Sequence, residues 1–126
     1  MKISNFIFLL GILVIGFASC KKDEAKSMTG TWEGTWGYGY EFPSFFEKWD
    51  LEKNGDLLSF FPDGSLYANG TWELDGEEFE ALYTTLEDNY TYRFTGEYDE
   101  DKEEIKGTWV EVQFPTNGGT FEMEKE

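Results

Sequence analysis

The chain has 126 residues, enough for one small domain, and its 26 acidic against 10 basic side chains give a formal net charge of −16 at pH 7. So acidic a surface repels nucleic acid and anionic lipid headgroups, and we expect neither as a partner. Histidine is absent and cysteine occurs once, which excludes histidine-based catalytic triads and histidine metal sites.

The N-terminus has the pattern of an export signal that ends at the single cysteine. Lys2 is the only charged residue before Cys20, and residues 6–18 are apolar or glycine throughout. This run is shorter than the roughly 20 residues of a membrane-spanning helix, and it suits the hydrophobic region of a signal peptide. Residues 17–20, Phe-Ala-Ser-Cys, resemble a bacterial lipobox, in which the cysteine is acylated and becomes the first residue of the mature chain.

The alternative is a signal peptide that ends near an unrelated cysteine. A single thiol in an exported domain is open to oxidation and mispairing, whereas acylation converts it to a thioether. Two or more acyl chains anchor a protein stably, because each buried CH₂ contributes about 0.8 kcal/mol. We therefore predict a signal peptide at residues 1–19, then an acylated Cys20 that begins a flexible tether at residues 20–29.

This anchor predicts a lipoprotein of the bacterial cell envelope, attached to the outer membrane. The charged residues 21–24 also resemble the surface-export signals of some Gram-negative lipoproteins. Both the periplasmic face and the cell surface therefore stay open as locations.

From residue 30 onward the hydrophobic pattern has a period of two, which indicates β-strands. In residues 30–40, GTWEGTWGYGY, the Trp and Tyr side chains share one face, and the Thr and Glu side chains share the other. Pairs such as Asn54-Gly55 and Asp75-Gly76 are typical of tight turns. The pattern predicts eight short strands, at residues 30–40, 45–51, 57–61, 66–74, 79–85, 90–98, 105–114 and 120–124.

The links between these strands are too short for the crossovers of a parallel sheet, and no segment after the signal shows a helical stripe. The sequence therefore predicts an all-β domain at residues 30–126, with eight antiparallel strands in up-and-down order closed into a barrel. Closure removes the exposed edges that an open sheet would leave. A two-sheet sandwich is the alternative, and it more often has longer, Greek-key links.

One local unit occurs four times, as Gly30-Thr31-Trp32, Gly70-Thr71-Trp72, Gly107-Thr108-Trp109 and Gly119-Thr120-Phe121. The glycine and the aromatic residue lie two positions apart and so share a face, with the threonine on the other face. Small and large side chains that alternate on an inner face suit the taper of a barrel wall. The repeated unit therefore favours a barrel.

An opening Gly-x-Trp, eight short strands, the late "IKGTW" and the closing "GGTFEMEK" resemble the lipocalin-like and avidin-like barrels, in particular the small lipocalin-like domains of bacterial lipoproteins. The resemblance covers residues 30–125 and implies that Trp32 plugs the closed end of the barrel. Arg93, the single arginine, has outward parity, so the arginine that often packs over this tryptophan has no counterpart. Biotin is not implied, because no motif matches the polar biotin contacts of avidins.

Strand parity gathers many rings on the predicted inner face. These rings either pack a solid core or leave a pocket at the open end that grips an apolar or aromatic molecule, and the sequence leaves both outcomes open. The inward set is Trp32, Trp36, Tyr38, Phe45, Trp49, Leu66, Trp72, Tyr90, Tyr92, Phe94, Ile105, Trp109, Phe121 and Met123.

Two glutamates, Glu47 and Glu111, share this inward parity. A carboxylate among rings needs a partner or a raised pKa, and it is then a candidate contact for a polar ligand group. A strand end in contact with water is the more common position, and we expect it for both residues. For a pocket, the candidate ligand-binding residues are Trp36, Glu47, Trp49, Tyr92, Trp109 and Glu111.

The sequence predicts no catalytic, metal or cofactor site. The acidic residues 98–104 lack the glycine and the spacing of a calcium loop, so we expect a solvated hairpin tip there. Paired carboxylates can cleave glycosidic bonds, but 26 acids offer too many pairs to single one out. We predict a non-catalytic, lipid-anchored protein that binds a small apolar or aromatic molecule. The alternative is a surface accessory module that binds a glycan or a protein partner through exposed aromatic residues and acidic loops.

Overall fold

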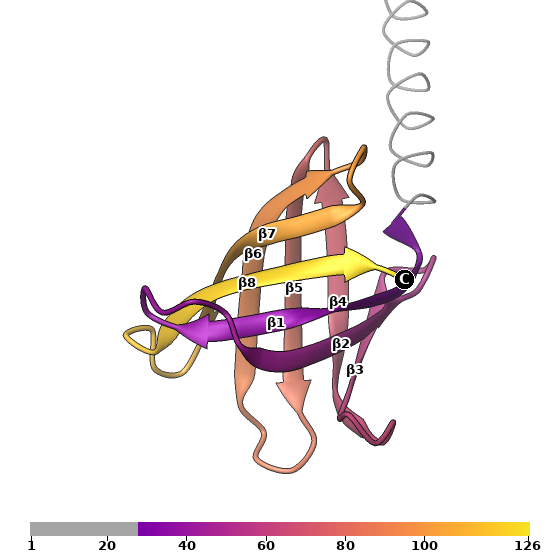
Figure 1. Cartoon of the computed structure of the whole chain (residues 1–126). Coiled ribbons are helices and arrows are strands. Elements are labelled where there is room, and N and C mark those ends of the chain that lie inside the picture. Colours follow the sequence, from indigo (N-terminus) through magenta and orange to yellow (C-terminus); the bar gives the residue numbers. More distant parts are fainter. Residues whose placement is uncertain (1–27) are drawn as a thin grey trace, which may run out of the picture.

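The computed structural model describes residues 28–126, which form a closed barrel of eight antiparallel strands (Figure 1). Every strand pairs with its neighbour in sequence, and β1 also pairs with β8, which closes the sheet. The predicted up-and-down barrel is confirmed, and the sandwich alternative is wrong. The predicted signal peptide, Cys20 and most of the tether lie outside the described residues. The strands are β1 Gly30–Tyr38, β2 Phe45–Leu51, β3 Asp56–Phe60, β4 Leu66–Asp75, β5 Glu78–Thr85, β6 Thr91–Asp99, β7 Glu104–Glu111 and β8 Gly118–Lys125.

The seventh strand is shorter than predicted. The alternating pattern predicts a strand up to residue 114, but β7 ends at Glu111. Residues 112–117 form the β7–β8 loop, in which the Asn117 N–H donates to the Phe114 carbonyl oxygen at 2.9 Å. The Glu111 N–H donates to the Asn117 carbonyl oxygen at 2.9 Å, so the chain turns back directly after Glu111 and the strand ends there. Phe114 is consequently exposed on the loop.

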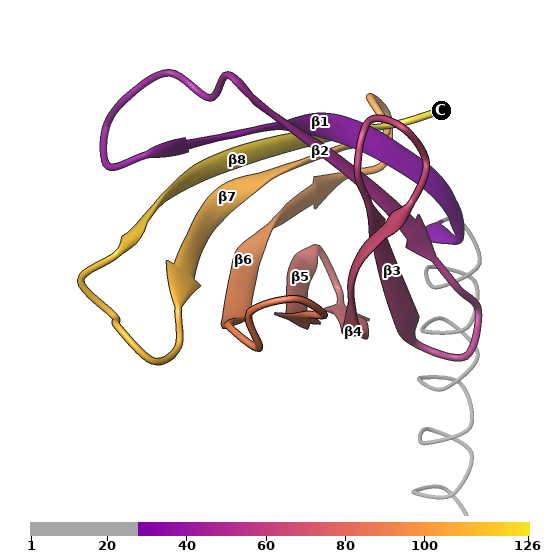
Figure 2. The same cartoon turned by 90° about the horizontal axis from the view of Figure 1, so that it is seen from below.

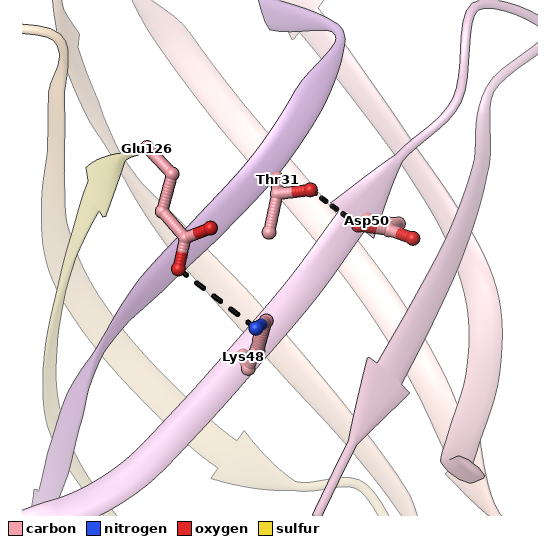
Figure 3. A network of polar contacts seen from close by, with 4 residues as sticks. All are labelled: Thr31, Lys48, Asp50 and Glu126. Carbon is pink, nitrogen blue, oxygen red and sulfur yellow. Dashed lines mark hydrogen bonds and ion pairs between the residues drawn. The ribbon is translucent and has the colours of Figure 1, made fainter. Parts of the chain in front are cut away.

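The outer face of β1 and β2 is polar, as the period of two predicts. The Thr31 hydroxyl donates to Asp50 Oδ1 across the two strands at 2.8 Å. Further along β2, Lys48 Nζ lies 3.9 Å from Glu126 Oε1 (Figure 3). Threonine of the repeated Gly-Thr-aromatic unit therefore faces solvent here, and its aromatic neighbour faces the interior. Across residues 28–126, no helix is both long enough and apolar enough to cross a membrane.

The barrel end at which β1 begins is closed by packed side chains. Trp32 is fully buried there, and its indole N–H donates to the carbonyl oxygen of Met28, itself buried, at 2.8 Å. The ring of Tyr98 meets Trp32 edge-on, with 6.0 Å between ring centroids. Trp32 thus plugs this closed end, in the position that the resemblance to lipocalin-like barrels implies.

The middle of the barrel is also solid. Trp49 is fully buried and stacks on Phe79, with 5.8 Å between centroids and 16° between ring planes. Phe94 meets Trp49 edge-on at 5.1 Å, and Phe121 meets Phe94 edge-on at 5.2 Å. Edge-to-face ring pairs are a favourable arrangement beyond their burial. These four rings form a layer that separates the closed end from the open end.

Four members of the predicted inward set are exposed instead of buried, namely Tyr38, Phe45, Leu66 and Tyr90. All four lie at the open end. Each is the first or last residue of a strand, or, for Tyr90, the residue just before one. Parity gives the face of a strand but not the depth along the barrel axis, and that explains the error. Parity also left out several buried side chains, namely Leu57, Ser59, Phe79, Ala81, Tyr83 and Tyr98.

Three glycines of the repeated unit are required by close approach of a neighbouring strand. A methyl group on Gly70 would overlap the Leu82 carbonyl oxygen of β5, and Gly107 and Gly119 have equivalent contacts with the carbonyl oxygens of β6 and β1. Glycine at such positions lets a strand bend tightly as the sheet curls into a barrel. The predicted alternation of small and large side chains is present. Its physical basis is the close approach of the neighbouring strand's backbone, in addition to the taper of the barrel wall.

We expect Gly70→Ala to lower the free energy of unfolding by about 3 kcal/mol, because β4 and β5 must separate to admit the methyl group. Gly76→Ala is the matched control. It has open space around it and a φ of 65°, so strain in the turn should cost only about 1 kcal/mol. Urea unfolding followed by tryptophan fluorescence measures both variants, and equal losses would contradict the role assigned to Gly70.

Candidate functional site

A cavity of about 260 Å³ opens at the barrel end where β1 finishes. This volume lies slightly below the roughly 300–1,000 Å³ of sites that hold drug-sized ligands, so it suits a small molecule. Phe94, a member of the solid aromatic layer, also lines this cavity. Both sequence alternatives therefore describe part of the barrel, a solid core in one half and a pocket in the other. The lining consists of Trp36, Tyr38, Tyr67, Tyr83, Tyr92, Phe94, Trp109 and Asn117.

The rings around this cavity hold one another in place. Trp36 stacks on Phe45 at 4.7 Å and meets Trp109 edge-on at 5.2 Å between centroids. The Trp109 indole N–H donates to the Gly37 carbonyl oxygen at 3.0 Å, which fixes the ring against β1. Tyr92 in turn meets Trp109 at 5.8 Å. The wall is therefore ordered before any ligand binds, which lowers the entropic cost of binding.

Glu47 is buried, so its expected position in water is wrong. The residue is 3% exposed, and Oε2 accepts two hydrogen bonds, from the Tyr83 hydroxyl at 2.8 Å and the Trp49 indole N–H at 3.0 Å. Burial raises the pKa of Glu47 to about 7, although these two donors favour the charged form. The Ser59 hydroxyl itself has no hydrogen-bond partner among the described residues. The physical reason for the burial is that Tyr83 reaches across the interior from β5 and covers the carboxylate.

Glu111 is also buried, which corrects the second expectation of a carboxylate in water. It is 6% exposed, and its Oε1 accepts from the Asn117 side-chain amide at 3.2 Å. The other oxygen, Oε2, is buried without a hydrogen-bond partner among residues 28–126. The cause is the β7–β8 loop, which folds back so that the Glu111 N–H donates to the Asn117 carbonyl oxygen at 2.9 Å.

The side wall of the barrel opens between β2 and β3. The two strands pair over only three residue pairs, which end at Trp49 and Ser59. Beyond that point the strands diverge toward the open end (Figure 1). A second cavity of about 210 Å³ occupies the gap, and it shares Trp36 and Tyr67 with the first cavity. Glu47 lines this second cavity, although its side chain is buried.

A β-bulge explains one lining residue that sequence parity could not find. The register of β3 and β4 shifts between Ser59 and Phe60, where Ser59 pairs with Ala68 but Phe60 pairs with Leu66. Tyr67 is the extra residue on β4, and a bulge of this kind re-aims side chains. Its ring therefore lines the cavity despite its outward parity, and Leu66, which parity places inside, is exposed.

The six predicted ligand-binding residues divide into three groups. Trp36, Tyr92 and Trp109 line the main cavity. Glu47 lines the second cavity, and Glu111 lies behind Asn117, which lines the first. Trp49 lies deeper, in the solid layer, and contacts the site through its hydrogen bond to Glu47. The prediction missed the lining residues Tyr38, Tyr67, Tyr83, Phe94 and Asn117, of which Tyr38 and Phe94 had been placed on the inner face without a binding role.

Figure 2 shows the strands curving around the interior, with the open-end loops projecting beyond them. The acidic segment predicted as a solvated hairpin tip is the exposed β6–β7 turn at the other end. Within residues 28–126, no three His, Cys, Asp or Glu side chains are grouped to hold a metal ion. No family model, curated protein or solved structure matches the chain.

The buried Glu47 makes a testable contribution to stability. Its pKa is about 7 in the folded chain against an ordinary 4.5, so the folded state binds this proton more tightly than the unfolded chain does. The resulting stabilisation is full below pH 4.5, declines as the pH rises toward 7, and is absent above that. The difference between the two pKa values corresponds to a change of about 3 kcal/mol in the free energy of unfolding.

We expect Glu47→Gln, which keeps the shape and the acceptor for Tyr83 and Trp49, to match the parent chain near pH 4. Above pH 8 it should be more stable by about 3 kcal/mol. Urea unfolding across this pH range measures the difference. Glu73→Gln, on the exposed face of β4, is the control, and its free energy of unfolding should stay close to that of the parent chain. If the effect of Glu47→Gln on stability does not vary with pH, the pKa assigned to Glu47 is contradicted.

Proposed function

We propose that this chain is a lipid-anchored protein of the cell envelope whose lipocalin-like barrel binds a small apolar or aromatic molecule, without catalysing a reaction. The observation that carries this proposal is the cavity of about 260 Å³ at the open end, walled by seven aromatic rings and one amide. Rings of this kind give a ligand a large apolar contact area at a low entropic cost.

The placement of the barrel on its tether also supports a binding role. The chain enters the barrel at the closed end, where Met28 is buried beside Trp32. An anchor at Cys20 would therefore be attached to the closed end. The open end lies at the opposite end of the strands, so the cavity is at the end of the barrel that does not carry the tether.

A second candidate function is supported by the apolar side chains around the opening. All ten large hydrophobic side chains that are exposed in residues 28–126 lie in the four open-end loops or at the strand ends beside them. Apolar residues gathered on one end of a domain are typical of an interaction surface. These residues fit a surface module that binds a glycan or a protein partner, and they are Tyr38, Tyr40, Phe42, Phe45, Phe61, Leu66, Leu86, Tyr90, Val112 and Phe114.

Paired substitutions separate the two functions. Trp36→Leu removes one ring from the cavity wall, and we expect it to weaken binding of indole, a small neutral aromatic probe, about tenfold. Tyr40→Ala, on the β1–β2 loop where the side chain is fully exposed, should leave that binding unchanged. Isothermal titration calorimetry on the full chain in detergent measures both affinities. Loss of binding in Tyr40→Ala but not in Trp36→Leu would instead favour the surface module.

The anchor has its own test. We expect Cys20→Ser to abolish incorporation of labelled palmitate and either to release the protein from the membrane or to leave its signal peptide uncleaved, because acylation requires the thiol. Cell fractionation and autoradiography of the labelled chain measure the two effects. A Cys20→Ser chain that still incorporates the label would rule out the lipobox.

A further inference from the structure

The interior of the open end contains two buried carboxylates with two tyrosines between them. Glu111 on β7 pairs in register with Tyr92 on β6, and Tyr92 pairs with Tyr83 on β5. Tyr83 then reaches across the interior and donates to Glu47 on β2 at 2.8 Å. Both tyrosines line the main cavity. One side of this cavity therefore consists of two phenol groups with an acid at either end of the row.

This arrangement makes the site electronegative. The two acids contribute to raising the pKa of the phenols beside them, after the larger effect of burial, Glu47 for Tyr83 and Glu111 for Tyr92. Aromatic rings add to the effect, because the face of a ring carries partial negative charge and attracts cations. An anionic ligand is therefore disfavoured at this site.

The described part of the chain supplies no positive charge to balance the two acids. None of the basic residues in this part lines either cavity. Lys48, Arg93 and Lys106 form ion pairs on the outer face. The pair of Arg93 with Glu80, at 3.5 Å, also confirms the predicted outward position of that arginine. The basic residues between 28 and 126 are Lys48, Lys53, Arg93, Lys102, Lys106 and Lys125.

A buried carboxylate normally has a cationic or hydrogen-bond-donating partner, because burial of an unpaired charge is costly. Glu111 lacks one at Oε2, which is buried and accepts no hydrogen bond from the described residues. Its neighbour Asn117 bonds only to Oε1 and itself lines the cavity. An N–H donor brought by a ligand past Asn117 would satisfy the free oxygen.

Building on the proposed function, we propose that the ligand of this cavity is a small protonated amine with an apolar or aromatic body. Its ammonium group binds at the acidic row formed by Glu47, Tyr83, Tyr92 and Glu111, and its body packs against Trp36 and Trp109. An ammonium group provides both the positive charge that the site lacks and the N–H donors that Glu111 Oε2 can accept. The rings hold the rest of the molecule and add cation–π attraction.

Three probes of nearly equal size test the charge of the ligand. Phenethylamine is cationic at pH 7, 2-phenylethanol is neutral and phenylacetate is anionic. With the full chain in detergent, calorimetry should show phenethylamine binding at least tenfold more tightly than 2-phenylethanol, and no binding of phenylacetate. Equal affinities for the amine and the alcohol would overturn the inference but leave the proposed function intact. Absence of binding by all three, and by indole, would overturn both.

Variants of the two acids test their roles. Glu111→Gln and Glu47→Gln should each reduce the preference for phenethylamine over 2-phenylethanol by at least fivefold. Glu73→Gln, on the outer face of β4, should keep the full preference. Circular dichroism checks that each variant is folded. A preference for the amine that survives in both interior variants would show that the general negative charge of the protein causes it, and would overturn the assigned site.

Discussion

Pairing between β1 and β8 is the constraint on which the rest of the structure depends. The two strands pair over seven residue positions, from Trp32 with Lys125 to Tyr38 with Gly119, and this pairing turns an open sheet into a barrel. An eight-stranded barrel leaves an interior only wide enough for packed side chains or one small ligand. The large rings of Trp32, Trp49 and Phe79 fill that interior in the closed half. The cavity exists because the open half contains rings that lie against the walls and against one another.

The site also depends on two departures from regular sheet geometry. The short pairing of β2 with β3 lets these strands diverge, and the bulge in β4 turns Tyr67 toward the cavity. Irregular pairing and bulges are common beside functional sites, because they aim side chains in directions that a regular strand does not allow. The regular ladders stabilise the barrel, and the irregular β2–β3–β4 region shapes the opening. The stability of the barrel and the shape of the cavity therefore depend on different parts of the molecule.

The sequence predicted the barrel well because period-two alternation and turn residues are local signals. It placed Trp36, Tyr92 and Trp109 on the inner face, where they line the cavity, since parity determines the face of a strand. The sequence-based prediction failed where contacts between distant parts of the chain determine the position of a side chain. The bulge at Ser59 and Phe60 reversed the faces expected for Leu66 and Tyr67, and the burial of Glu47 requires Tyr83, a residue 36 positions away in the chain. The burial of Glu111 follows from a loop that the alternating pattern had extended as strand.

The two buried acids, Glu47 and Glu111, are informative because their burial is electrostatically unfavourable in so acidic a chain. At a formal net charge of −16, repulsion already opposes the compact state, and an acid in the interior adds a desolvation penalty. A solid core of rings, as in the closed half, would avoid this penalty. Local features that reduce stability without a compensating contact are typical of functional sites. In the complex that we propose, the ammonium group of the ligand supplies the missing positive charge and offsets this loss, so the bound barrel should gain more stability than the apolar contacts alone would give.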